Sequence, residues 1–225
     1  MMMHQIYHSL IMLSLSCISI TGCSMNKTLP PNTIWELEQI DEAGSPFNWR
    51  IYSRTHADVA VKEFKIIGEV PYAPMEAINI LREQTENSTA YLPEDQGYIK
   101  VIKSRSDMLQ IYSVFYMPLF FKSRAMCEHF AIQQDPTSGM AKITWHSDWS
   151  LCPDSRRDTI QMTLAEGSWR FEPISVKHSK AIYTVHADLG GAIPAFLNDL
   201  LIKSGLPNEF EKLGRKPLHG TSKGL

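Results

Sequence analysis

Two histidines have a spacing that could support chemistry. A turn centred on residues 137–138 would pair the flanking strands as an antiparallel hairpin and place His129 directly opposite His146. Two imidazoles on one face could begin a zinc site, which needs a full tetrahedral set of ligands. The spacing fixes no third ligand, so we expect polar side chains of a surface or cavity here, with no metal and no cofactor.

Cys127 lies two residues before His129 in the chain, so on a strand the two side chains share one face. A nucleophilic thiol needs a base within hydrogen-bonding reach and a third group that orients the base. The spacing identifies no such groups, and the sequence contains no nucleophile elbow, phosphate-binding loop, dinucleotide fingerprint or H-E-x-x-H motif. We therefore expect a protein that is not an enzyme. Cys127 and Cys152 could form a disulfide if their distance and orientation allow it.

The balance of charges disfavours one class of partner. The chain of 225 residues carries 22 Lys and Arg against 24 Asp and Glu, a formal net charge of −2. Binding to nucleic acid leaves a basic footprint, so we expect no nucleic-acid partner. Arg124 and Glu128 could instead anchor the polar head group of a lipid, or could belong to an ordinary solvated strand face.

The N-terminal segment has the composition of a secretory signal. Residues 6–20 are largely apolar and contain no Asp, Glu, Lys or Arg. The segment ends in Ile20-Thr21-Gly22-Cys23, which resembles a bacterial lipobox. We expect a signal peptide over 1–22 and a lipidated cysteine with a polar tether over 23–31, anchoring the protein to the periplasmic side of the outer membrane. The alternative is an uncleaved apolar segment in which Cys23 is an ordinary residue.

Hydrophobic periodicity predicts a helix at the start of the folded domain. A cap at Asn32-Thr33 would begin this helix, which would run to about Glu42 with Ile34, Leu37 and Ile40 facing inward. Gly and Pro after residue 43 would then end it.

Alternating apolar residues with β-branched and aromatic side chains predict a series of strands after this helix. A second helix is expected over 75–86, and a long amphipathic helix starts near Ile193 with an apolar stripe at Phe196, Leu197, Leu200 and Leu201. The predicted strands span residues 47–56, 61–70, 97–103, 108–117, 124–133, 140–148, 156–165, 168–173 and 180–187.

This order of elements predicts one domain over 32–216, followed by a flexible tail over 217–225. Many antiparallel strands and one long final helix favour an α+β fold in which a curved antiparallel sheet wraps around the C-terminal helix.

Three segments resemble the START (steroidogenic acute regulatory protein-related lipid transfer) family: GSWRFEP over 167–173, IYTV over 182–185 and DLGGAIPAFLN over 188–198. Leu189 stands where the family usually has proline. Together with the lipobox, the chain resembles a START protein of the bacterial lipoprotein type. The resemblance implies the helix-grip fold and an internal cavity for one hydrophobic molecule (a lipid, a sterol-like or a fatty-acyl ligand), held by a monomer and carried between membranes.

The resemblance also implies a set of ligand-binding residues and a hinge. Gly190 and Gly191 would allow motion of the final helix. For each lining residue the alternative is that it fills a packed core, and for the whole protein the alternatives are a helix-grip enzyme of the cyclase or aromatase type and a structural envelope lipoprotein with a filled core. The expected lining residues are Phe64, Phe115, Phe130, Trp145, Trp169, Phe171, Phe196, Leu197 and Leu200.

Overall fold

The computed structural model describes residues 34–41, 44–87, 97–117, 121–152 and 158–214. The expected signal peptide, Cys23, the tether and the tail over 217–225 all lie outside the described residues. None of the helices in the described part combines the length and the apolar character that a membrane crossing requires.

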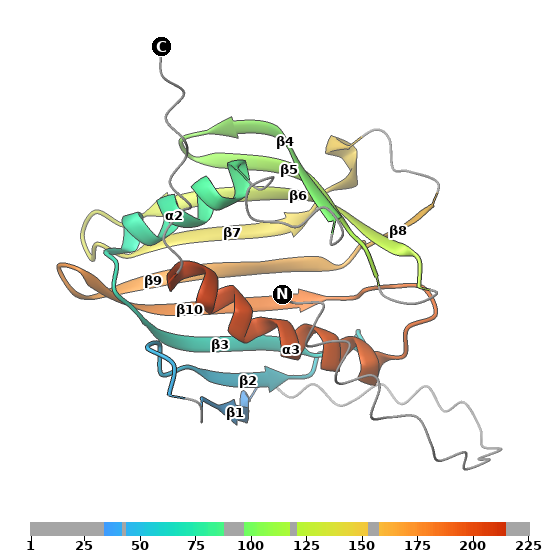
Figure 1. Ribbon diagram of the computed structural model, residues 1–225, viewed down its shortest axis with the longest axis horizontal. Coiled ribbons are helices and arrows are strands. Elements are labelled where there is room, and N and C mark those ends of the chain that lie inside the picture. The colour runs from blue at the N-terminus through green and yellow to red at the C-terminus, as the bar shows by residue number, and fades with distance from the viewer. Residues whose placement is uncertain (1–33, 42–43, 88–96, 118–120, 153–157, 215–225) are drawn as a thin grey trace.

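A ten-stranded sheet forms the body of the molecule (Figure 1). All neighbouring strands along its main path are antiparallel, and β8 (Thr159–Gln161) pairs in parallel with β6 outside that path. The order across the sheet is β1 (Glu36–Ile40), β2 (Arg50–Arg54), β3 (Glu63–Val70), β10 (His178–Ala187), β9 (Ala165–Ser175), β7 (Ala141–Ser147), β6 (Ser123–Gln134), β5 (Met108–Phe115) and β4 (Gly97–Arg105).

Two helices lie over the same face of this sheet (Figure 1). The helix α2 (Pro74–Glu86) begins with proline at its first position, where the missing N–H costs little, and it packs on β7 and β9. The helix α3 (Ala195–Gly214) is the last element and packs on β3. We call the face covered by these helices the inner face and the opposite face the outer face.

The packed core fills the inner face beneath the helices, over β2, β3, β10 and β9. Phe210 of α3 has no exposed surface, and its ring centroid lies 5.2 Å from that of Trp169 and 6.3 Å from that of Phe47. Full burial of such a side chain stabilises the fold by about 1.5–3 kcal/mol. This half of the interior is therefore closely packed around the C-terminal half of α3.

The first predicted element is wrong in type. Residues expected to form a helix up to Glu42 instead include the edge strand β1, in which Leu37 pairs with Tyr52 and Ile40 with Arg50. Leu37 and Ile40 are exposed rather than inward. The backbone groups of β2 offer an unpaired edge, and pairing with that edge outweighs the weak helical spacing of a short segment. The α+β architecture, with a large antiparallel sheet and a long C-terminal helix, is confirmed.

Candidate functional site: the inner face of the sheet

The inner face of β4, β5 and β6 is covered unevenly, because Leu109, Ile111 and Ser113 of β5 are buried there while other side chains of the same face are not. Because α3 makes its main sheet contacts with β3 and α2 with β7 and β9, neither helix has its main contacts over β5 or β6. Apolar side chains on this part of the face are only partly buried, which is unusual for large apolar groups on the inner face of a sheet. They are Ile99, Phe115, Met126 and Phe130.

The structure divides the nine expected lining residues into three groups. Phe115 and Phe130 lie at the partly covered region, and Leu197 is half-buried on α3. Four others are almost fully buried within the packed core and fill space rather than border it: Phe64, Trp145, Trp169 and Phe171. Phe196 and Leu200 of α3 are 74% and 43% exposed.

Asn198 explains why Phe196 and Leu200 of α3 face outward. Its Oδ1 accepts a hydrogen bond from the backbone N–H of Leu189 at 2.8 Å, and its Nδ2 donates to the carbonyl of Ala187 at 3.1 Å. These bonds turn Asn198, which is 1% exposed, toward the sheet. Phe196 and Leu200 lie two residues to either side of Asn198, so they point to the opposite side of the helix. The only sequence feature that could have indicated this orientation of α3 was the single amide side chain of Asn198 among apolar helix residues.

A buried acidic group lies within the partly covered region. Glu128 of β6 is 5% exposed, and the hydroxyl of Ser113 on β5 donates to its Oε2 at 3.2 Å. Burial raises the pKa of Glu128 to about 7, the hydrogen bond from Ser113 opposes that rise, and the charge of Glu209 on α3 adds to it. Glu128 is therefore not on a solvated strand face.

Tyr183 of β10 lies against the packed core, where its ring centroid is 4.6 Å from that of Trp169. Burial raises the pKa of Tyr183 well above its ordinary value, and the charges of Glu209 and Glu128 raise it further. Part of the Tyr183 surface nevertheless remains uncovered by protein atoms. A carboxyl from β6, a phenol from β10 and a carboxyl from α3 therefore influence one another electrostatically in the interior. Sequence reasoning had placed neither Tyr183 nor Glu209 in the site, because they lie on distant elements.

Arg124 holds the turn before α3. Its Nε donates to the carbonyl of Leu189 at 2.8 Å and its Nη2 to the carbonyl of Gly190 at 3.0 Å, while Nη1 donates to the carbonyl of Lys122. Burial lowers the pKa of Arg124, and the charge of Asp188 opposes that change. The side chain is 1% exposed and not part of a solvated face. Every nitrogen of the guanidinium is thus engaged in positioning the turn.

The turn itself depends on Gly190 and Gly191. Their φ angles are +66° and +68°, in the left-handed region that side chains other than glycine rarely adopt. A Cβ at Gly191 would lie 2.6 Å from Cδ1 of Ile160 on β8. The backbone conformation therefore restricts this position to glycine, whereas the contact would require the end of the Ile160 side chain to shift.

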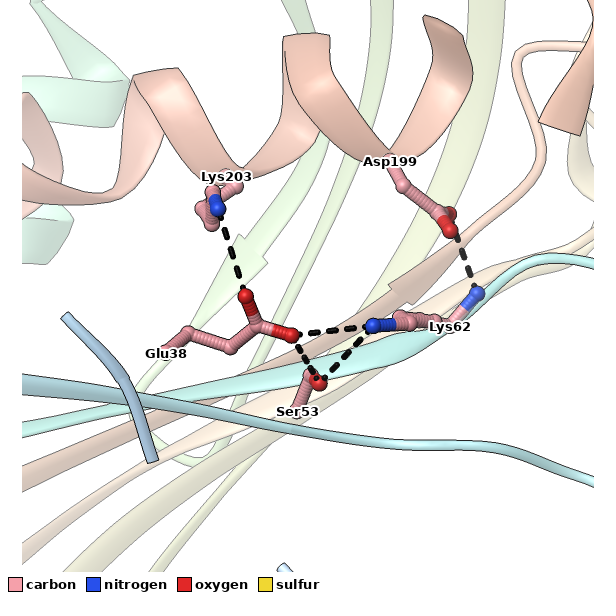
Figure 2. Close-up of polar contacts among 5 residues, drawn as sticks. All are labelled: Glu38, Ser53, Lys62, Asp199 and Lys203. Atoms are coloured by element: carbon pink, nitrogen blue, oxygen red, sulfur yellow. Dashed lines mark hydrogen bonds and ion pairs between the residues drawn. The ribbon is translucent and has the colours of Figure 1, made fainter. Parts of the chain in front are cut away.

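A polar network joins α3 to β1, to β2 and to Lys62, which directly precedes β3 (Figure 2). Glu38 of β1 lies 2.9 Å from Nζ of Lys62 and 3.3 Å from Nζ of Lys203 on α3, and it accepts a hydrogen bond of 2.7 Å from the Ser53 hydroxyl. Asp199 of α3 accepts a bond of 3.0 Å from the backbone N–H of Lys62. The hydrogen bond from Ser53, with those from the two lysines, lowers the pKa of Glu38 to about 2, although burial opposes the change.

The outer face carries the cysteines and the paired histidines. Cys127 and Cys152 are joined in a disulfide, with their Cα atoms 6.0 Å apart. His129 pairs with His146 across β6 and β7, as the predicted hairpin register requires, and their ring centroids lie 5.6 Å apart. In the described ranges, no three His, Cys, Asp or Glu side chains are grouped in a way that could hold a metal ion.

Two open hollows lie outside this interior region. One, of about 660 Å³, is bordered by Phe47, Tyr72 and His178 near the end of α3. The other, of about 380 Å³, lies on the outer face beside His146 and His186. Neither is lined by the residues of the partly covered region, so neither takes the place of the expected ligand site.

Solved structures with the same arrangement of elements are StAR-related proteins. A STAR-related lipid transfer protein from Xanthomonas axonopodis is 18% identical, covers 80% of this chain and 96% of its own, and superimposes with a TM-score of 0.67. Human STARD10 is 13% identical over 80% of this chain and 71% of its own, with a TM-score of 0.63. Human StAR-related lipid transfer protein 5 is 11% identical over 94% of this chain and 92% of its own, with a TM-score of 0.62.

No protein-family model and no curated protein matches the chain by sequence. The likeness in structure nevertheless extends over most of the chain. The chain therefore has the START-like helix-grip fold, a large antiparallel sheet combined with a long C-terminal helix.

Proposed function

We propose that this protein binds one hydrophobic molecule between the inner face of β4–β6 and α3, and that it carries the molecule as a monomer within the bacterial envelope. The observation that carries the proposal is the partial coverage of side chains deep in the fold. Tyr183 and Phe130 lie on the inner face, yet protein atoms leave part of each uncovered. An apolar guest would cover this surface.

Burial of apolar surface supplies enough free energy for such binding. At about 25 cal/mol per Å², covering a few hundred Å² of a lipid is worth several kcal/mol before the losses on association. No covalent step is needed, and the proposal is a binding and transfer function without catalysis. The likeness to proteins described as lipid transfer proteins supports the same class of ligand.

Binding can be tested with the neutral fluorescent probe N-phenyl-1-naphthylamine and with native mass spectrometry of the purified domain. We expect saturable probe fluorescence and a co-purifying lipid mass. Met126→Trp, which adds bulk at the partly covered region, should weaken probe binding by roughly tenfold or more. Lys142→Trp, on the outer strand face of β7, is the matched control and should leave probe binding unchanged.

The alternative to a ligand-binding interior is one that side chains fill completely. The part of the core around Phe210 is already closely packed in this way. Empty protein by native mass spectrometry, together with no uptake of the probe, would establish that the rest of the interior is filled as well. A structural role would then replace the binding function.

We also propose that Cys23 is acylated and holds the domain at the periplasmic face of the outer membrane. The support is the lipobox-like sequence before Cys23 and the apolar run that precedes it. Cys23→Ser should release the protein from sedimenting membranes into the soluble fraction. A variant that still sediments with membranes would contradict acyl anchoring without affecting the binding proposal.

A further inference from the structure

We infer that the outer face of the sheet docks on an anionic phospholipid membrane through the corner formed by β1, β2 and β3. This surface, the β1–β3 corner, combines exposed apolar and aromatic side chains with cations. It consists of Trp35, Leu37, Ile40, Arg50, Tyr52 and Lys65. The inference goes beyond the proposed ligand binding and does not depend on it. It rests on the proposed acylation of Cys23 only for the distance between the corner and the membrane.

The pairing register places these side chains on the outer face. Leu37 pairs with Tyr52 and Ile40 with Arg50, and Lys65 pairs with Tyr52 from the other side. Tyr52 and Lys65 each lie between two side chains that are buried on the inner face: Ile51 and Ser53 for Tyr52, and Phe64 and Ile66 for Lys65. Alternation along a strand therefore directs the corner outward. Leu37 is 53% and Ile40 47% exposed, and both helices cover the opposite face (Figure 1).

Aromatic rings hold two cations at this corner. Nζ of Lys65 lies 4.0 Å from the ring centroid of Trp35 and 5.0 Å from that of Tyr52, and Cζ of Arg54 lies 4.6 Å from the Trp35 centroid. Trp and Tyr rings have an apolar body and a polar tip, which suits the level of the lipid head groups. Lysine and arginine keep their charge at that level while their stems cover apolar surface. With the exposed leucine and isoleucine, the corner has the composition of a surface that lies on a membrane.

The outer face is positively charged around the corner. Arg50 and Lys65 form no salt bridge within the described ranges, whereas Arg54 pairs with Glu63 at 2.5 Å. Burial lowers the pKa of Lys65, and three neighbouring cations lower it further although Glu63 opposes them: Arg54, Arg170 and Lys180. The outer face of β2, β3 and β10 carries the cations Arg50, Arg54, Lys65 and Lys180 and the carboxylates Glu63 and Glu69.

The helical face has the opposite charge. The helices α2 and α3 carry the carboxylates Glu76, Glu83, Glu86, Asp199, Glu209 and Glu211 against the cations Arg82, Lys203 and Lys212. An anionic leaflet therefore repels the helical face and attracts the corner. Phe196 and Leu200 are also exposed apolar residues, but they belong to this acidic side of the molecule. Charge complementarity thus selects the corner over α3.

The chain leads from Cys23 to the corner. Trp35 is the twelfth residue after Cys23, and a stretch of that length spans at most about 40 Å. An acyl chain on Cys23 would therefore keep the corner near the bilayer. A few cations and partly exposed apolar side chains bind a membrane only weakly by themselves, so docking orients the acylated protein rather than anchoring it. The helical face, with the proposed ligand region, then points away from the membrane.

Vesicle flotation tests the corner without an acyl chain. The protein used is the chain over 24–225, which lacks Cys23 and keeps every described element. At about 50 mM salt, vesicles of phosphatidylcholine with about 30% phosphatidylglycerol should bind it roughly tenfold more tightly than phosphatidylcholine alone, and about 0.5 M salt should abolish the difference. Lys65→Gln and Arg50→Gln should each weaken binding by roughly fivefold. Leu37→Ser should weaken it by roughly threefold.

Two variants on the helical face are the matched controls. Lys212→Gln removes a cation from α3, and Phe196→Ser removes an exposed apolar side chain from the same helix. Both should leave vesicle binding unchanged. The corner variants should retain binding of N-phenyl-1-naphthylamine, because the corner lies on the face opposite the proposed ligand region.

Equal affinity for the two kinds of vesicle, or no binding to either, would overturn the inference and leave the ligand proposal intact. Unchanged binding in folded Lys65→Gln and Arg50→Gln variants would overturn it too. Loss of vesicle binding in Phe196→Ser would assign docking to the helical face instead of the corner. If the probe does not bind while docking still depends on phosphatidylglycerol and on the corner, only the ligand proposal fails.

Discussion

Glu38, on the first described strand, lies 3.3 Å from Lys203 on the last helix. The contact joins positions 165 residues apart in the chain and places α3 against the strand edge formed by β1 and β2. Glu38 lies where the pairing of β1 with β2 shifts register, between Leu37 and Gln39. This irregularity in β1 directs the Glu38 carboxylate toward α3. The start and the end of the domain therefore stabilise each other.

Glu38→Gln should lower the free energy of unfolding by about 1 kcal/mol at neutral pH, a value that allows for solvent screening of a partly exposed pair. The folded pKa of Glu38 is about 2 against an ordinary 4.5, so its stabilisation is present above pH 4.5 and is lost as the pH falls toward 2. In urea unfolding across this pH range, the free energies of unfolding of the natural protein and the variant should become equal in acid. A double-mutant cycle with Lys203→Met measures the coupling, and a coupling of zero would contradict the role of the pair.

Glu128 should affect the pH dependence of the free energy of unfolding in the opposite direction to Glu38, and Glu128→Gln should remove that effect. The folded pKa of Glu128 is raised to about 7, so the folded state binds the proton more tightly than the unfolded state, whose value is near 4.5. The natural protein should therefore lose about 2–3 kcal/mol of stability relative to the variant as the pH rises from 4.5 through 7. Thermal and urea unfolding at several pH values measure this difference, and parallel curves for the two proteins would show an ordinary pKa.

Asn198→Leu should destabilise the protein by about 2 kcal/mol, although it adds apolar volume to a buried position. The substitution leaves the N–H of Leu189 and the carbonyl of Ala187 without partners. Phe196→Ser is the matched control on the same helix, and because Phe196 is 74% exposed it should change stability by no more than about 0.5 kcal/mol. If Phe196→Ser lost more stability than Asn198→Leu in chemical denaturation, α3 would have to turn a different face toward the sheet.

Gly191→Val should destabilise the domain, because its φ of +68° strains any side chain and the new Cβ would also displace the end of the Ile160 side chain. Gly44→Val separates this collision from backbone strain, since Gly44 has a φ of +67° and no atom within 4 Å of an added Cβ. Because the end of the Ile160 side chain can move, Gly191→Val should cost no more than about 1 kcal/mol more than Gly44→Val. Equal melting temperatures for the two variants would remove close packing at Gly191 as a constraint.

Reduction of the disulfide between Cys127 and Cys152 should lower the free energy of unfolding by about 3 kcal/mol, as expected for a bridge that closes a loop of this length. Urea unfolding with and without a reductant measures the effect. Cys152→Ala should lose the same stability and show no further response to the reductant. A response that persists in the variant would have to come from other cysteines.

Most of the element order can be predicted from local patterns in the amino-acid sequence. Alternation predicted the strands from Arg50 onward, the turn at 137–138 set His129 opposite His146, and the apolar residues after Ile193 predicted a long final helix. These features depend on neighbours along the chain, so local periodicity contains the information needed to recognise them.

The type of the first element and the rotation of the last depend on contacts between residues that are distant in the chain. β1 is a strand because β2 offers it an edge, and Phe196 faces solvent because Asn198 bonds to backbone groups near residue 188. The raised pKa of Glu128 likewise depends on burial and on Glu209, far away in the chain. Periodicity says which residues share a face, whereas long-range hydrogen bonds and burial decide which face is covered.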